Sequence, residues 1–306
     1  MNRRQFLHTL AASSLASAVP ASAAPLPAPH QGDRSSGASF QLSVMLWTVF
    51  RDLPFEQRLE KVASAGYRNV ELVGEFHNWS PAQFAQANAA RRRLSISFDA
   101  TAGLGHGVGD PAARAAFLAD LRRMLAVMET LACPAVIALS GNVVPALSRQ
   151  AQHQSCIEGL KRAAAIVDGR RIAGQPVRIL LECIDPEENP KYFLTSAAEA
   201  IEVVRAVNHP QVQFLYDIFH EQIAEGNLIE KIEKHSDVIG LIHVADVPGR
   251  HDPGTGEINY ANIYRKLYEL NYQRGVAMEF LPIGDPVQAL SQARKALESA
   301  WPLNNA

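Results

Sequence analysis

The chain has 306 residues, of which 47% are hydrophobic and 20% are charged, a balance typical of an ordinary globular protein. Its formal net charge of -2 gives no basic footprint of the kind that nucleic-acid-binding proteins carry. A mean hydropathy of -0.06 excludes a protein with many membrane-spanning helices.

The N-terminus has the pattern of an export signal. A pair of arginines at positions 3 and 4 precedes an apolar, alanine-rich stretch that ends at Val19, and the small residues Ala21 and Ala23 suit a signal-peptidase site. The arginine pair favours a twin-arginine signal, which exports folded proteins, over an ordinary secretory signal. The apolar stretch is shorter than the roughly 20 residues that a membrane span needs. We therefore predict a twin-arginine-type signal peptide over residues 1–23 and a periplasmic protein that has no membrane attachment after cleavage.

Residues 24–38 are rich in Pro, Ala, Gly and Ser and predict a flexible leader. From there to residue 302, short β-branched and aliphatic runs alternate with segments of helical period. The predicted strands are Leu42–Leu46, Asn69–Val73, Leu94–Phe98, Ala135–Leu139, Val177–Leu181, Val212–Tyr216, Ile239–Val244 and Val276–Phe280. The predicted helices are Pro54–Ala65, Pro81–Arg92, Pro111–Leu131, Arg149–Ala173, Thr195–Ala206, Leu228–His235, Tyr260–Leu270 and Pro286–Ser299.

Eight strand–helix units predict an α/β fold, a single (β/α)₈ TIM barrel over residues 39–302. A doubly wound parallel sheet is the alternative, but no Gly-x-Gly-x-x-Gly motif follows any of the predicted strands. The segment 246–259 is long for a loop in a compact barrel and carries several charged residues, which is typical of a functional loop.

In TIM barrels the active site lies at the carboxyl ends of the strands. The last four predicted strands end at or beside Glu182, Asp217, His243 and Glu279, so each delivers one metal-ligating side chain to the same mouth. Three carboxylates would repel one another in a buried site unless a cation lay between them. The oxygen-rich set with one imidazole favours Mg²⁺ or Mn²⁺, and is compatible with Co²⁺ or Zn²⁺.

Further side chains near these strand ends are candidates for substrate binding. His220 lies three residues after Asp217, and the loop after the seventh strand contains Arg250, His251 and Glu257, of which the Arg can bind a carboxylate bidentately. Trp47 and Phe50, which follow the first strand, can supply an apolar wall over a small sugar. Weaker candidates are Glu71 near the end of the second strand and Asp99 just past the third.

Several of these segments resemble the hydroxypyruvate isomerase family, most strongly between residues 179 and 281. The matching stretches are Leu181-Glu182-Cys183-Ile184, Asn189-Pro190-x-Tyr192-Phe193-Leu194, Tyr216-Asp217-x-x-His220, the run from His243 to Tyr260, and Leu53-Pro54-Phe55-x-x-Arg58. The resemblance implies a xylose-isomerase-like barrel with a metal held at Glu182, Asp217, His243 and Glu279. It also implies that Glu182 and Glu279 act as the acid/base pair, and that His220 and Arg250 hold substrate oxygens.

The expected function is therefore a metal-dependent isomerase that interconverts hydroxypyruvate and tartronate semialdehyde through an enediolate. An exported ketose epimerase, or a lyase or hydratase of keto-glycosides, is the alternative, because His243 looks more like the epimerases and the Gly-rich segment Thr101–Asp110 lacks the Trp-containing loop expected in the isomerases. An apurinic-site endonuclease and a non-catalytic sugar-binding barrel are less favoured. We expect a small keto acid or sugar as the partner and no nucleic acid, and a homo-oligomer is compatible with the sequence.

Overall fold

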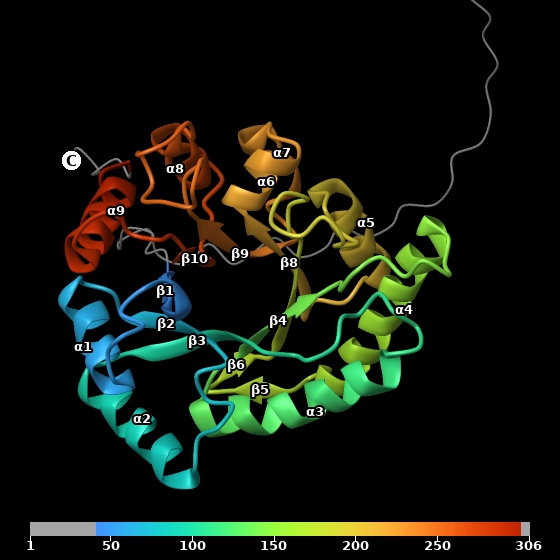
Figure 1. Ribbon diagram of the computed structural model, residues 1–306, viewed down its shortest axis with the longest axis horizontal. Helices are drawn as coiled ribbons and strands as arrows, with labels where there is room; N and C mark the ends of the chain where they lie inside the picture. Colours follow the sequence, from blue (N-terminus) through green and yellow to red (C-terminus); the bar gives the residue numbers. More distant parts are fainter. Residues whose placement is uncertain (1–40, 301–306) are drawn as a thin grey trace, which may run out of the picture. The chain divides into compact units, whose positions relative to one another are not determined.

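The computed structural model of the protein describes residues 41–300. The predicted signal peptide (1–23), the leader (24–38) and the outermost residues of the predicted domain (39–302) lie outside this range. Eight parallel strands close into one barrel, and helices surround it (Figure 1). The prediction of a single (β/α)₈ barrel is confirmed.

The barrel strands follow the order β1-β10-β9-β8-β7-β4-β3-β2, so strands that are consecutive in the chain pair with one another. Because every pairing is parallel, all carboxyl ends meet at one mouth. Their bounds are β1 (Gln41–Met45), β2 (Asn69–Val73), β3 (Ser97–Ala102), β4 (Ala135–Leu139), β7 (Arg178–Glu182), β8 (Val212–Asp217), β9 (Ile239–Val244) and β10 (Gly275–Met278).

The helices form a ring outside the strands (Figure 1), and several begin at a side-chain cap. Ser80 and Gln83 make a capping box at α2, and Ser148, Ser196 and Asn259 each accept a backbone N–H in the first turn of a helix. Within the described range, no helix has the length and apolar character needed to cross a bilayer. The helices are α1 (Phe55–Ser64), α2 (Pro81–Arg93), α3 (Arg114–Leu131), α4 (Arg149–Val167), α5 (Ala197–Val207), α6 (Ile218–Ala224), α7 (Leu228–His235), α8 (Tyr260–Glu269) and α9 (Pro286–Ala300), with a short 3₁₀ turn η1 (Leu46–Thr48).

The core has two parts, because successive side chains of a strand point to opposite faces. The larger part lies between the strands and the helices. The smaller part fills the barrel interior and consists of Met45, Ala100, Ala135, Ile137, Leu180, Leu215, Leu241 and Ala277. Since this layer closes the barrel below the mouth, polar side chains at the strand ends lie in a pocket and not in a pore.

The predicted third strand, Leu94–Phe98, was placed too early. Leu94 ends α2 with helical backbone angles, Ser95 has a φ of 54°, and β3 runs from Ser97 to Ala102. The pairing of β2 with β3 shifts register between Val70 and Glu71, which leaves Asp99 as an extra residue inside the strand. The prediction began the strand at the apolar residues Leu94 and Ile96, but these belong to the end of α2 and the turn that follows it.

Two further boundaries differ from the prediction. The helix predicted over Arg149–Ala173 ends at Val167, and the strands β5 (Arg171–Ile172) and β6 (Gln175–Pro176) then form a small antiparallel hairpin. Gly169, with a φ of 68°, makes the turn before the hairpin, and Ala173 and Gly174, with φ of 50° and 78°, form the turn between its two strands. The short helix α6 was not predicted, because it begins directly after Asp217 without an intervening loop.

Candidate metal and active site

Four side chains from neighbouring strands converge at the barrel mouth. Glu182 and Asp217 end β7 and β8, His243 is the fifth residue of β9, and Glu279 follows β10 directly. All four are buried, and one ligand atom from each lies within 4.8 Å of the others. The structure thus brings together the four residues that the strand ends predicted.

The geometry around His243 fits a divalent cation. Its Nδ1 atom lies 2.6 Å from Glu279 Oε2 and 3.9 Å from Glu182 Oε1. Nδ1 and Oε2 are both buried, and apart from the ion pair between them and that of Oε2 with Arg250, neither makes a hydrogen bond among the described residues. Buried polar atoms are normally satisfied, so such a pair facing other acidic groups fits a divalent cation as its partner. Three carboxylates and one imidazole are donors that Mg²⁺, Mn²⁺ and Zn²⁺ all accept.

The two glutamates differ in their electrostatic surroundings. Burial, together with the Glu279 carboxylate, raises the pKa of Glu182 to about 8. Burial also acts to raise the pKa of Glu279, but the charges of Arg250 and His243 outweigh it and hold that pKa well below its usual range. The same two carboxylates therefore prefer different protonation states, which is common where one site needs both an acid and a base.

Arg250 links the cluster to the loop after β9. Its Nη2 atom lies 2.8 Å from both Asp217 Oδ2 and Glu279 Oε2, and its Nη1 atom donates to Glu188 Oε2 at 3.1 Å. The guanidinium also lies over the Phe219 ring, 4.9 Å from its centroid. The loop thereby holds the buried, positively charged guanidinium of Arg250 against the carboxylates.

His220 lies in the first turn of α6, three residues after Asp217. Its Nδ1 donates to Asp185 Oδ2 at 2.6 Å, and its Nε2 lies 3.4 Å from Asp217 Oδ2. Burial lowers its pKa, but the carboxylates of Asp217 and Asp185 outweigh burial and raise that pKa to about 9. His220 is therefore held as a hydrogen-bond donor at the edge of the mouth.

A cavity of about 240 Å³ lies between two unlike walls at this mouth. Trp47, whose Nε1 donates to Glu279 Oε1 at 2.7 Å, lies between them. One wall is polar and contains Glu182, Glu188, His220, Arg250 and Glu279. The other wall is mainly apolar and contains Met45, Val73, Ala102, Leu104, Ile137 and Leu139.

Two predicted substrate residues lie away from this cavity. His251 donates from Nδ1 to the backbone oxygen of Leu281 at 2.8 Å, and the exposed Glu257 accepts from Gln222 at 3.0 Å. Neither contributes to the cavity lining. Both side chains support the loop that carries Arg250 and do not face the acidic cluster.

Two residues at the site received little or no weight from the sequence. Asp185 anchors His220 and also accepts the backbone N–H groups of Glu187 and Glu188 at 2.8 Å and 2.9 Å. The short acidic run after Glu182 is the signal that could have indicated it. Glu71, a weak candidate from the sequence, lies fully buried with Oε2 only 2.9 Å from His243 Nε2.

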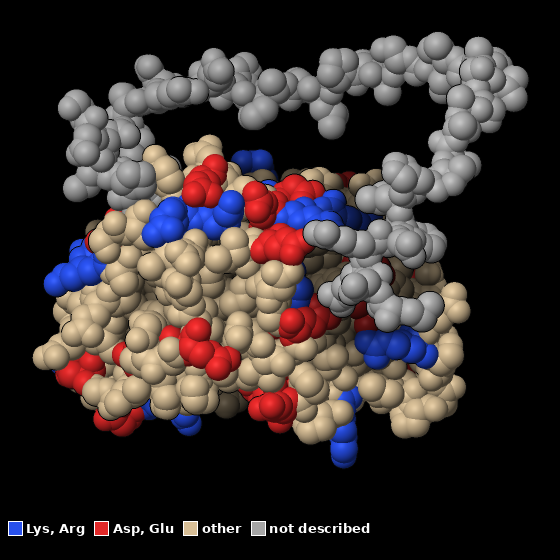
Figure 2. All heavy atoms as spheres, turned by 90° about the horizontal axis from the view of Figure 1, so that it is seen from above, with Lys and Arg blue, Asp and Glu red and all other residues tan. Residues whose placement is uncertain are grey.

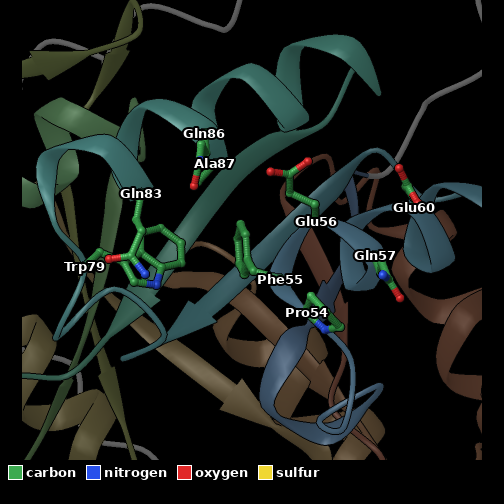
Figure 3. Close-up of a pocket in the computed structure, with 9 residues that line it drawn as sticks. All are labelled: Pro54, Phe55, Glu56, Gln57, Glu60, Trp79, Gln83, Gln86 and Ala87. Carbon is green, nitrogen blue, oxygen red and sulfur yellow. The ribbon is translucent and has the colours of Figure 1, made fainter.

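A larger hollow of about 530 Å³ lies between α1 and α2, on the outside of the barrel (Figure 3). Phe55 and Trp79 meet edge to face in it, with ring centroids 4.6 Å apart. The residues that line this outer hollow are Pro54, Phe55, Glu56, Gln57, Glu60, Trp79, Gln83, Gln86 and Ala87. None of the four converging residues is among them, so the barrel mouth is the candidate active site.

Comparison with solved structures gives the same barrel. A structure described as an AP endonuclease, family 2, from Brucella melitensis is 25% identical and has a TM-score of 0.74, covering 84% of this chain and 98% of its own. An IOLI protein with a bound zinc atom has a TM-score of 0.70 at 19% identity, covering 85% of this chain and 98% of its own. At that identity the second likeness shows the fold alone.

Sequence comparison narrows the family. A 2-oxo-tetronate isomerase from Pectobacterium atrosepticum is 31% identical over 82% of this chain and 95% of its own length. A putative hydroxypyruvate isomerase from Danio rerio is also 31% identical, over 81% of this chain and 92% of its own length. The family model for the xylose isomerase-like TIM barrel matches residues 59–300. The chain therefore belongs to the xylose isomerase-like TIM barrel family, and its likeness to these relatives makes it an isomerase.

Proposed function

We propose that the protein is a metal-dependent isomerase of small hydroxy-carbonyl compounds, and that it interconverts hydroxypyruvate and tartronate semialdehyde. The observation that carries the proposal is the convergence of Glu182, Asp217, His243 and Glu279 within 4.8 Å beside a cavity that suits a small molecule. The relatives named as hydroxypyruvate and 2-oxo-tetronate isomerases support the same reaction class.

The reaction moves a proton between two adjacent carbons. In the forward direction, one of Glu182 and Glu279 removes a proton from C3 of hydroxypyruvate, which gives the enediolate, and the other returns a proton to C2. A second proton passes from the C3 hydroxyl to the former carbonyl oxygen, so the product is an isomer with no other reactant consumed. A divalent cation, when bound, polarises the substrate oxygens and stabilises negative charge on them.

The surrounding residues bind the substrate and limit water access. Arg250 and His220 present N–H groups at the polar wall, where they can hold a substrate carboxylate and hydroxyl. Trp47 donates to Glu279 and so orients that carboxylate toward the cavity. The apolar wall keeps water away from the enediolate, which strengthens these electrostatic contacts.

The cluster would hold the cation through Glu182, Asp217, His243 and Glu279. We propose Mg²⁺ or Mn²⁺, because three of the four donors are carboxylates. Co²⁺ and Zn²⁺ are also compatible with the single imidazole.

A ketose epimerase, or a lyase or hydratase of keto-glycosides, is the second candidate, and His243 is the residue that favours it. The same proton abstraction beside a carbonyl would serve these reactions, so the substrate decides between them. An endonuclease has less support, because the formal net charge is -2 and, on the one face that Figure 2 shows, basic and acidic side chains are interspersed. A non-catalytic sugar-binding barrel would bind a ligand without exchanging its carbon-bound protons.

Proton NMR in D₂O tests the proposal directly. The purified protein is stripped of metal, reloaded with Mn²⁺ or Mg²⁺, used to convert hydroxypyruvate, and removed with its metal before the spectrum is recorded. We expect metal-dependent loss of the C3 proton signal and a new hydrated-aldehyde signal. Conversion of 3-keto sugars or ketohexoses without reaction of hydroxypyruvate would favour the second candidate, and binding without any exchange would favour the non-catalytic barrel.

We also propose that the protein is exported to the periplasm by the twin-arginine route. The proposal rests on residues 1–23 alone, in particular the arginine pair at positions 3 and 4. Replacing both arginines by lysine should leave the precursor uncleaved in the cytoplasm, as seen by fractionation and N-terminal sequencing. Normal export of that variant would indicate an ordinary secretory signal instead.

A further inference from the structure

The buried carboxylate of Glu71 contacts Nε2 of His243, the ring nitrogen that points away from the acidic cluster. Glu71 lies on β2, where it pairs in register with Met45 of β1 and Ala100 of β3. Its side chain crosses the barrel interior to β9, so that its Oε2 atom lies 2.9 Å from His243 Nε2. Both side chains have 0% exposure to solvent.

This contact determines which nitrogen of His243 faces the cluster. A ring nitrogen that ligates a metal carries no proton, so with Nδ1 directed at the cluster the proton of the neutral ring lies on Nε2, where the Glu71 carboxylate accepts it. Nδ1 is then the nitrogen directed at Glu182 and Glu279, from which it is 3.9 Å and 2.6 Å away. The ring cannot rotate freely, because its two nitrogens contact carboxylates on opposite sides.

Packing alone does not explain a glutamate at this place. The second oxygen of Glu71, Oε1, is buried and has no hydrogen-bond partner among the described residues. Burying an unsatisfied carboxylate oxygen is costly, and a leucine of similar size would fill the same space at a lower cost. The contact with His243 is the one interaction of Glu71 that a hydrophobic residue could not reproduce.

We infer that Glu71 is a positioning residue that holds His243 with Nδ1 toward the metal, an inference that rests on the metal site of the proposed function. By accepting the Nε2–H, the carboxylate selects one tautomer and one ring orientation of the ligand. It also makes Nδ1 a stronger electron-pair donor to the metal, as outer carboxylates do for histidine ligands in general. Glu71 itself touches neither the cavity nor the substrate.

Asp99 offers a matched control within the same barrel. It is a second acidic residue of the strands β1 to β4, placed at the register shift of β3, and it accepts from Ser43 Oγ at 2.8 Å. No contact joins it to His243 within the described part of the chain. Neutralising Asp99 therefore removes a like charge that acts on Glu71 and leaves the hydrogen bond between Glu71 and His243 itself in place.

Calorimetric titration of the metal-free protein with Mn²⁺ tests the inference without measuring activity. We expect Glu71→Leu to weaken Mn²⁺ binding by about 10- to 100-fold, the usual effect of losing such a partner. Glu71→Gln, whose amide oxygen can still accept the Nε2–H, should recover part of that loss, and Asp99→Asn should bind as the wild type does. Equal affinity in all four proteins, or an equal loss in Glu71→Leu and Asp99→Asn, would overturn the inference.

A measurement on the wild type keeps the test valid if a variant fails to fold. In the Mg²⁺-loaded protein, ¹⁵N NMR of the histidine rings should show His243 protonated at Nε2 and unprotonated at Nδ1. The opposite tautomer would contradict the role of Glu71 even if the metal binds. A wild-type protein that binds no divalent metal would instead refute the metal site of the proposed function, so the two failures are distinguishable.

Discussion

The two halves of the barrel mouth are built from the same strand–helix unit but end in opposite chemistry. The strands β7 to β10 deliver Glu182, Asp217, His243 and Glu279, which are all buried. The strands β2 and β4 end in Val73 and Leu139, whose exposed fractions of 36% and 39% leave apolar surface open to the cavity. If the proposed function holds, we expect the polar half to carry the reactive groups and the apolar half to select the substrate by its shape.

The largest effect is expected from the two glutamates of the polar half. Glu182→Gln and Glu279→Gln each remove a carboxylate that can accept a proton, with almost no change in shape. We expect kcat to fall by about 10²- to 10⁴-fold, the range that general acid–base groups contribute, with a much smaller change in KM. Stopped assays with hydroxypyruvate, repeated over a range of Mn²⁺ concentrations, measure both constants.

Leu139→Ile is the control for this pair, since it changes the opposite wall without adding or removing charge. It should keep kcat close to that of the wild type. Wild-type rates in both glutamine variants would end the proposed mechanism. A loss that disappears at higher Mn²⁺ concentration would assign the glutamate to metal binding and not to proton transfer.

A smaller effect is expected at Arg250, which contacts three carboxylates of the polar half. Arg250→Lys keeps the positive charge but replaces the planar fork by a single ammonium, which cannot make the same set of contacts. Loss of one or two charge-assisted hydrogen bonds, each worth about 1.5–3 kcal/mol, should lower kcat/KM by at least about tenfold. Initial rates over a range of substrate concentrations test this.

Phe219 packs its uncharged ring under the guanidinium, so replacing it changes the surroundings of Arg250 and leaves the charge of Arg250 in place. Phe219→Leu should change kcat/KM less than Arg250→Lys does. An unchanged kcat/KM in Arg250→Lys would show that Arg250 holds the loop after β9 in place and does not bind the substrate.

The positions of the four converging residues could be predicted from the sequence, whereas the contacts of Glu71 and Asp185, which support them, could not. Each of the four converging residues stands at the end of an apolar run, and the fold rule that active sites lie at carboxyl ends of strands placed them together. Glu71 and Asp185 could not be placed in this way. Glu71 contacts His243 from a strand on the far side of the barrel, and Asp185 contacts His220 across 35 residues, so pattern along the chain does not reveal either contact.

The third strand shows a different limit. Apolar residues from Leu94 onward suggested a strand that ended at Phe98, yet Leu94 and Ile96 pack in the core as parts of a helix end and its turn. The register shift opposite Val70 and Glu71 adds one residue to β3, which the alternation of side chains could not show. Turns and bulges depend on backbone geometry, and the sequence signals for them here were weak.

The smallest effect is expected on the apolar half, where Leu139→Asn would test whether this wall selects the substrate. An amide at the end of β4 should favour a substrate with an extra hydroxyl over hydroxypyruvate. Because a single contact of this kind discriminates by about 1–3 kcal/mol, the ratio of kcat/KM for a four-carbon 2-oxo acid to that for hydroxypyruvate should change by about tenfold. The affinity for Mn²⁺ should stay the same, since Leu139 is not part of the acidic cluster. An altered Mn²⁺ affinity with an unchanged substrate ratio would contradict the division of labour between the two halves, because the apolar wall would then support the metal and not the substrate.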